Sequence, residues 1–117
     1  METIGNSIKR VDAVAKVTGT AKSPGDFQFT DQLTMKVLFA GRPHAIIHSI
    51  NIEKAVAIPG VVTVLTAKDV PNNEYGLSIP DQPVLCGQGS NKEFDDRVRF
   101  EGDQIALVVA ENEQIAT

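Results

Sequence analysis

Residues 104–110 read QIALVVA, and Ile105 to Ala110 form the most continuous apolar run in the chain. A strand that is apolar at every position, rather than at alternate ones, is buried on both faces. We therefore predict a central, doubly buried strand here, with covering elements on each side. Immediately upstream, RVRF and the turn EGD at Glu101 to Asp103 predict that this strand is the second arm of a β-hairpin.

Three apolar segments upstream predict further strands. Residues 33–40, LTMKVLFA, alternate at first and then run apolar, which predicts a strand whose second half is buried on both sides. Residues 45–52, AIIHSINI, are rich in β-branched residues and predict a second strand. Residues 61–67, VVTVLTA, predict a third.

A short helix is predicted between the second and third of these strands. Asn51 is suited to cap its first turn, and Pro59-Gly60 ends it. We expect Gly60 to adopt a positive φ, so that Val61 can enter the sheet. The buried stripe of the helix follows the i, i+3, i+4 pattern, with Ile52, Ala55 and Val56.

Two segments lack a complete element. Residues 72–96 carry several prolines and glycines and are predicted to be one irregular, exposed excursion. Residues 111–117, ENEQIAT, predict the first turn of a helix that Asn112 caps and whose Ile115 faces the core. We expect the domain to be truncated inside this helix, so that the uncovered sheet edge associates with a second copy or the C-terminus frays from about Asn112 onward.

Composition indicates one soluble globular domain over residues 1–117, with 42% apolar and 22% charged residues. The net charge of −4 and the scarcity of aromatic residues argue against nucleic acid as a partner. No apolar run reaches the roughly 18 residues of a membrane span, and the N-terminus lacks the apolar core of a secretion signal. The single cysteine, Cys86, cannot form an internal disulfide and is interpreted as an ordinary thiol near a loop. We predict a cytoplasmic location.

The residues that could carry chemistry favour structural interpretations. His44 and His48 would lie about one turn apart on a helix, roughly 6 Å, but about 13 Å apart on a strand, too far for one metal ion. The isoleucines between them favour the strand, so we interpret both as surface or capping histidines. The acidic residues near the predicted hairpin are interpreted as solvated turn charges rather than paired catalytic carboxylates; they are Asp95, Asp96, Glu101 and Asp103.

No glycine-rich phosphate loop is predicted. The glycines Gly60, Gly87, Gly89 and Gly102 do not precede the Lys-Ser/Thr ending that such a loop requires. Residues 16–19, KVTG, lack the upstream glycine spacing and are predicted to form a local turn or short helix that packs an N-terminal arm at residues 1–18.

Several ordered motifs resemble the opening domain of the xanthine dehydrogenase and aldehyde oxidase family. They are KRVDAVAKVTGTAKSPGDF at Lys9–Phe27, GRPHAIIHSINIEKAVAIPGVVTVLTAKDVP at Gly41–Pro71 and VRFEGDQIALVVAE at Val98–Glu111, with the strand LTMKVLFA between the first two. One departure is Ser23, where the family leads us to expect an aromatic residue such as tyrosine, so that packing near Pro24 differs.

The resemblance implies an α+β fold of the α/β-hammerhead type, a mixed sheet with short helices, ahead of a larger region that binds the molybdopterin cofactor. It implies a parent oxidoreductase that hydroxylates aldehydes, purines or other N-heterocycles, or oxidises carbon monoxide, at molybdenum. Iron–sulfur and FAD centres would lie on partner domains or subunits. The general-base glutamate and the pterin-binding motifs lie downstream of this segment, so no catalytic, cofactor-binding or metal-binding residue is carried over to it.

We therefore predict a structural domain, inactive alone, that packs against the molybdopterin-binding region and other subunits, shapes the substrate channel and helps assembly. The alternative is a stand-alone adaptor that uses the same fold to bind a partner. A reading frame that continues several hundred residues past Thr117 favours the enzyme, and a natural stop there favours the adaptor.

Overall fold

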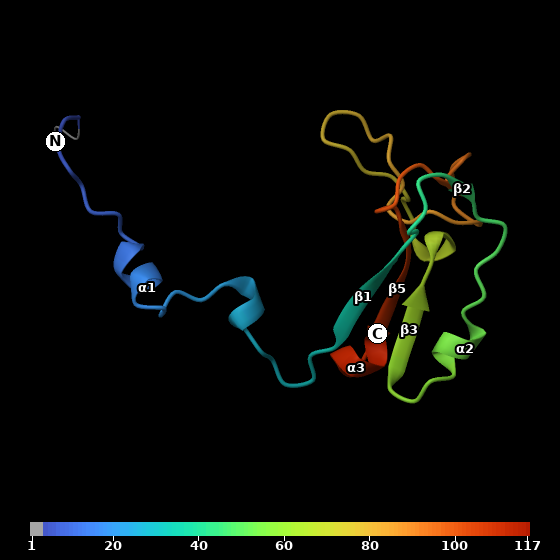
Figure 1. The fold of residues 1–117 in the computed structure, drawn as a ribbon, viewed down its shortest axis with the longest axis horizontal. Coiled ribbons are helices and arrows are strands. Elements are labelled where there is room, and N and C mark those ends of the chain that lie inside the picture. The colour runs from blue at the N-terminus through green and yellow to red at the C-terminus, as the bar shows by residue number, and fades with distance from the viewer. Residues whose placement is uncertain (1–3) are drawn as a thin grey trace. The chain divides into compact units, whose positions relative to one another are not determined.

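The computed structural model describes residues 4–117, and the chain divides into two compact units, Met1–Gln32 and Leu33–Thr117. In the first unit lie the helix α1 (Ala13–Val17) and a 3₁₀ turn at Pro24–Asp26 (Figure 1). The second unit holds every strand that the described residues form, together with two further short α-helices and a 3₁₀ turn at Ala67–Asp69.

Local contacts hold the elements of the first unit. Asp12 forms ion pairs with Lys16 (2.6 Å) and Arg10 (2.5 Å), and these two cations hold the pKa of its carboxyl below the usual range. Gly19 follows α1 with a φ of 72°, so the short helix or turn predicted at residues 16–19 is confirmed. Ser23 begins the 3₁₀ turn, where its N–H donates to Asp26 (2.7 Å). The first three residues of the predicted arm lie outside the described residues.

The larger sheet of the second unit has the order β1-β5-β3, and both of its pairings are antiparallel (Figure 1). Its strands are β1 (Thr34–Phe39), β3 (Val61–Leu65) and β5 (Gln104–Ala110). The prediction that QIALVVA is a central strand is therefore confirmed, as is the strand that begins at Val61.

Burial within this sheet is lower than the apolar pattern predicted. Only Ala106 and Ala110 of β5 are fully buried, and the apolar residues between them are half-buried. The second half of β1 is also not buried on both sides, because Leu38 and Phe39 are each 55% exposed. The physical reason is that β1 is an edge strand of a three-stranded sheet, with too few layers around it to cover both faces.

A second, two-stranded sheet corrects the predicted hairpin. β4 (Arg97–Val98) pairs antiparallel with β2 (Ala45–Ile46) and not with β5. Around the turn, the N–H groups of Ala40 and Gly41 donate to the carbonyls of Asp103 (2.8 Å) and Glu101 (3.0 Å). These bonds continue the pairing of β1 with β5. The predicted turn is present, since Asp103 N–H donates to the Phe100 carbonyl (3.1 Å), but the strands on its two sides do not pair with each other. The strand predicted at residues 45–52 is only two residues long in the structure, because its partner β4 is also only two residues long.

Two one-turn helices flank the larger sheet: α2 (Glu53–Val56) contacts β3, and α3 (Glu113–Ala116) contacts β1 and β5. The predicted cap at Asn112 is confirmed, since its Oδ1 accepts from Ile115 N–H (3.0 Å). At α2 the N-cap residue is Ile52, and Asn51, one position earlier, accepts at its Oδ1 from Glu53 N–H (2.9 Å). Gly60 has the expected positive φ, 89°. Val56 is nearly half-exposed, so its place in the buried stripe was wrong.

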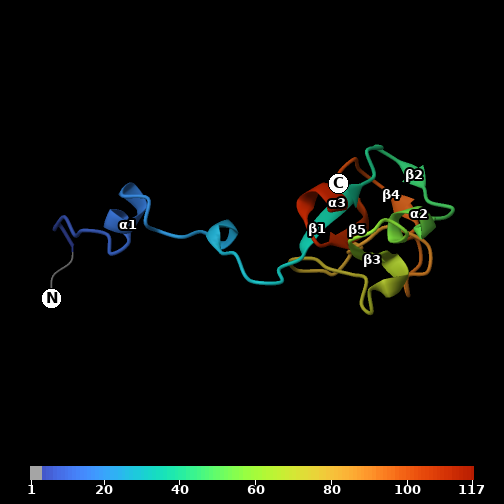
Figure 2. The same cartoon turned by 90° about the horizontal axis from the view of Figure 1, so that it is seen from below.

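Residues 72–96 contain much of the core. The segment is irregular, as predicted, but the prediction that it is exposed throughout is wrong. Its buried residues are Asn73, Leu85, Cys86, Gly87 and Asp95. Figure 2 shows the loops of this segment, coloured yellow to orange, beside the strands of the larger sheet. The predicted α+β class with short helices is confirmed, and the strands form two small antiparallel sheets.

Candidate functional site

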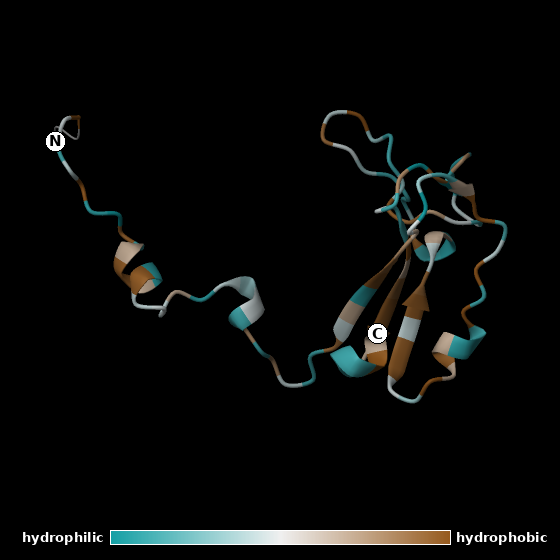
Figure 3. Cartoon of the chain, in the orientation of Figure 1, coloured by the Kyte–Doolittle hydropathy of each residue, from teal (hydrophilic) through white to brown (hydrophobic). Residues whose placement is uncertain are grey.

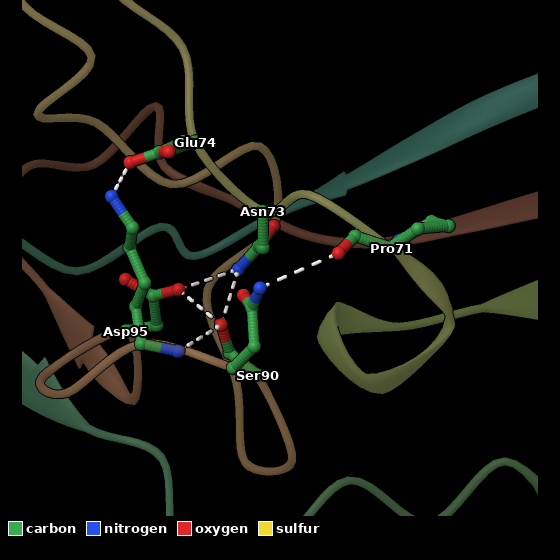
Figure 4. A network of polar contacts seen from close by, with 7 residues as sticks. Pro71, Asn73, Glu74, Ser90 and Asp95 are labelled. Atoms are coloured by element: carbon green, nitrogen blue, oxygen red, sulfur yellow. Dashed lines mark hydrogen bonds and ion pairs between the residues drawn. The ribbon is translucent and has the colours of Figure 1, made fainter.

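A buried polar cluster is built around Asn73, which is 0% exposed (Figure 4). Its Nδ2 donates to the Leu85 carbonyl (2.8 Å) and to Asp95 Oδ2 (2.7 Å), while its Oδ1 accepts from Leu85 N–H (2.9 Å). An amide side chain that bonds both backbone groups of one residue replaces the strand partner which that residue lacks. Asn73 therefore fixes Leu85 in the core.

Ser90 completes the Asn73 cluster without acquiring the features of a nucleophile. Its hydroxyl donates to Asp95 Oδ2 and accepts from Asn73 Nδ2 (3.2 Å) and from Lys92 N–H (3.2 Å). Nearby, the Lys92 ammonium forms an ion pair with Glu74. Activation of a serine requires a general base that takes its proton and is oriented by a third group. Here the Ser90 hydroxyl is instead hydrogen-bonded to Asp95, Asn73 and the Lys92 N–H, so its geometry indicates a structural role that holds this loop in place.

The Cys86 thiol is enclosed in the same region. It is 1% exposed, and its N–H donates to the Gln104 carbonyl at the start of β5 (2.7 Å). Burial, reinforced by the carboxylates of Asp103 and Asp95, raises the pKa of the thiol to about 11. Because the thiolate is the nucleophilic and metal-binding form, this environment suits a core side chain.

The two histidines flank β2 and are both exposed. His44 precedes Ala45, and His48 lies beyond Ile46, so the segment between them is extended rather than helical. Among residues 4–117, no group of three or more His, Cys, Asp or Glu side chains comes together as metal ligands could.

The four acidic residues singled out in the sequence have different environments. Glu101 is exposed, in keeping with a solvated turn charge, and Asp96 is half-buried. Asp103 closes its turn by accepting from the N–H groups of residues 99 and 100 (2.6 and 3.1 Å). Asp95 corrects the prediction, because it is only 7% exposed and bonded within the Asn73 cluster. Sequence could not reveal this, since the partners lie 5 and 22 residues away.

A cleft with a volume of about 300 Å³ lies beside this turn. Its walls include Tyr75, Phe100, Arg99 and Asp103. Asp103 is engaged by the turn, and Arg99 donates to the carbonyls of residues 97 and 94 (3.4 and 3.3 Å). Arg99 and Asp103 are thus bonded to this chain's own backbone, and the third charged residue of the walls, Asp81, is exposed, so the cleft has the character of a surface feature.

The sequence signal that could have revealed the Asn73 cluster is the pair Asn72-Asn73 after Pro71, since asparagine side chains readily pair with backbone groups near turns. That signal does not say which of the two side chains is buried.

Among residues 4–117, no helix has both the length and the apolar character needed to cross a membrane.

Comparison with known proteins identifies the family. The a/b hammerhead domain of aldehyde oxidase and xanthine dehydrogenase matches residues 18–117, so the chain belongs to this family. The chain is 48% identical over 108 residues to a probable xanthine dehydrogenase subunit of Bacillus subtilis (strain 168), covering 92% of this chain and 13% of that protein. It is 40% identical over 111 residues to the nicotinate dehydrogenase large molybdopterin subunit of Eubacterium barkeri, covering 94% and 24%.

A solved structure supports the same assignment. The aldehyde oxidoreductase of Desulfovibrio desulfuricans ATCC 27774 matches with a TM-score of 0.80 and 33% identity, over 96% of this chain and 13% of that chain. The chain thus spans between 13% and 24% of the length of these three relatives.

Proposed function

We propose that this chain is the N-terminal structural domain of the large subunit of a molybdenum-dependent oxidoreductase, and that it contributes no catalytic residue. The match of the hammerhead family to residues 18–117 carries this proposal. The relatives are, by name, a probable xanthine dehydrogenase subunit, a large molybdopterin subunit and an aldehyde oxidoreductase. By analogy, the parent enzyme hydroxylates aldehydes, purines or other N-heterocycles.

The molybdenum–molybdopterin cofactor belongs, in this proposal, to the remainder of the parent enzyme. The residues of this chain do not fit it: the described residues gather no metal-ligand set, and Asn73 and Asp95 bond to this chain's own groups. Protein-bound iron–sulfur clusters are held by several cysteine thiolates, whereas this chain has one cysteine. We assign iron–sulfur and FAD centres to partner domains or subunits and derive no chemical step in this segment.

The role that remains is packing. Residues 1–117 act as one hammerhead-like domain, with an arm at residues 1–18 and the irregular segment at residues 72–96. The domain packs against the molybdopterin-binding region and other subunits, shapes the substrate channel from outside and helps the enzyme assemble in the cytoplasm. Half-exposed apolar side chains on the larger sheet, such as Met35, Phe39 and Val62, support this role, because stable monomers rarely leave large apolar patches uncovered.

A chimera tests the proposal. In the Bacillus subtilis relative, this chain replaces the matching segment, and the same host with that segment deleted serves as the control. We expect the chimera to purify as a folded protein that contains molybdenum, and the deletion variant to lose it. A chimera with no more molybdenum than the deletion variant contradicts the proposed function.

The isolated 117-residue chain provides the complementary measurement. We expect elemental analysis and visible absorbance of the purified chain to show no molybdenum, iron or flavin, because it offers no ligand set for them. Stoichiometric metal or a visible chromophore in the isolated chain would overturn its assignment as a structural domain.

A further inference from the structure

A narrow loop at residues 75–82, here called the finger, projects from the second unit. Tyr75 and Gln82 close its base by exchanging backbone hydrogen bonds: Tyr75 N–H donates to the Gln82 carbonyl (2.7 Å), and Gln82 N–H donates to that of Tyr75 (3.0 Å). Figure 1 shows the finger as a golden loop that rises away from the strands.

The tip of the finger is apolar and fully accessible. Leu77 is completely exposed and Ile79 is 71% exposed, and no charged residue lies between Glu74 and Asp81. Figure 3 shows the brown, hydrophobic colour at this tip, above more hydrophilic flanks. Single exposed apolar residues are common on protein surfaces. Leu77 and Ile79 instead lie two residues apart at the uncharged end of one projection, where both side chains can enter a single complementary pocket.

The finger is braced at its base rather than free to collapse onto the sheet. Asn73, two residues before the finger, is hydrogen-bonded to Leu85 and Asp95, and Glu74, the residue between, is paired with Lys92. Within the finger, a side chain at Gly76 would collide with the Ile79 carbonyl, so the two sides of the loop lie in close contact. A projection held in one geometry loses less conformational entropy on docking than a flexible loop does.

We propose that the finger docks Leu77 and Ile79 into an apolar pocket of the molybdopterin-binding region of the same parent enzyme. This inference rests on the proposed function. Because the tip is uncharged and apolar, the pocket that receives it should be apolar. The relatives indicate the occupant: in them a segment like this one is 13% to 24% of a longer chain, whose remaining surface can receive the finger.

The test uses the isolated 117-residue chain and the Bacillus subtilis chimera described above. By hydrogen exchange, we expect the backbone amides of residues 76–81 to exchange at least about tenfold more slowly in the chimera than in the isolated chain. The double variant Leu77→Asp/Ile79→Asp should lower the Tm of the chimera by about 3 °C or more, and leave that of the isolated chain unchanged. Val11→Asp, which replaces another fully exposed apolar residue, is the matched control and should change neither.

The outcomes separate the two proposals. A wild-type chimera that holds no molybdenum refutes the proposed function and this inference with it. A chimera that holds molybdenum but leaves residues 76–81 unprotected, or tolerates the double variant as well as Val11→Asp, refutes the finger alone. If the isolated wild-type chain dimerises and the double variant is monomeric, the occupant is a second copy, and the assignment to the parent enzyme is overturned.

Discussion

Strand β5 is apolar at nearly every position yet is mostly half-buried, whereas the irregular segment at residues 72–96 is rich in proline and glycine yet contains side chains with no exposed surface. The difference is not one of hydrophobicity. β5 lies in a three-stranded sheet covered by helices of a single turn. The irregular segment lies where several loops meet, and its polar groups are paired there.

This contrast shows what limits burial in each region. A strand has its backbone paired by its neighbours, so its burial depends on the number of layers that cover it. A loop has an unpaired backbone, so it is buried only where other groups satisfy its N–H and C=O. Asn73 does this for both backbone groups of Leu85. The core at residues 72–96 therefore depends on the hydrogen bonds of one asparagine, whereas the core at β5 depends on the packing of the elements that cover the strand.

Asn73→Ala should have the largest effect. It removes the side chain that bonds Leu85, Ser90 and Asp95, and leaves a buried carboxylate and two backbone groups short of a partner. We expect a loss of about 3–5 kcal/mol in the free energy of unfolding, measured with urea. The matched control is Asn72→Ala, because the neighbouring Asn72 is exposed and its loss should stay within about 0.5 kcal/mol. Equal effects of the two variants would refute the dependence on one asparagine.

Gly60→Val tests the other region, where α2 leads into β3. The φ of 89° is strained for valine, and an added Cβ would lie 2.6 Å from Ile115 Cδ1 of α3. We expect a loss of about 1–3 kcal/mol in unfolding free energy. Gly41→Val is the control, because Gly41 also has a positive φ (58°) but nothing within 4 Å of its Cβ position. A Gly60 variant no less stable than the Gly41 variant would show that the contact with α3 carries no energy.

The sequence predicted the elements with strong local signals. The cap at Asn112, the positive φ of Gly60 and the central position of β5 all follow from residues within a few positions of one another. The pairing of β4 with β2 did not follow, because it joins residues about 50 positions apart. A turn signal such as that at residues 101–103 shows that the chain bends but not which strand it then joins.

The Asn73 cluster was also not predicted, because its members are likewise distant from one another in the sequence. Its members are polar and spread over residues 73–95, and each alone is typical of an exposed turn. Only the fold brings them together. The absence of a catalytic site from this segment was inferred from the lack of local motifs and from the family resemblance, and it stays a prediction that the chimera and the metal analysis test.

The stability of the irregular segment should also depend on pH through Cys86. Its pKa is about 11 in the folded chain, against an ordinary value near 9.0. Ionisation of the thiol therefore favours the unfolded chain: this contribution to stability is complete below pH 9 and is lost as the pH rises from 9 to 11. We expect wild type to lose about 2 kcal/mol more than Cys86→Ala across that range in urea titrations. Parallel losses in the two proteins would show that the thiol is not enclosed in solution.

The smallest expected effect concerns α3, the helix that covers part of the larger sheet. Asn112 Oδ1 accepts from Ile115 N–H (3.0 Å) and caps α3, the one-turn helix that packs on β1 and β5. Asn112→Ala should cost about 1 kcal/mol in unfolding free energy, whereas Asn112→Asp keeps an acceptor at the same place and should cost less.

Hydrogen exchange of the β5 amides gives the more direct measurement, because uncapping α3 should speed their exchange while leaving Leu85 protected. If the amides of β5 and of Leu85 lose protection together, the two regions unfold as one unit. If exchange changes neither at β5 nor at Leu85, α3 does not protect β5 from solvent. The partial burial of β5 is then due to the three-stranded sheet alone.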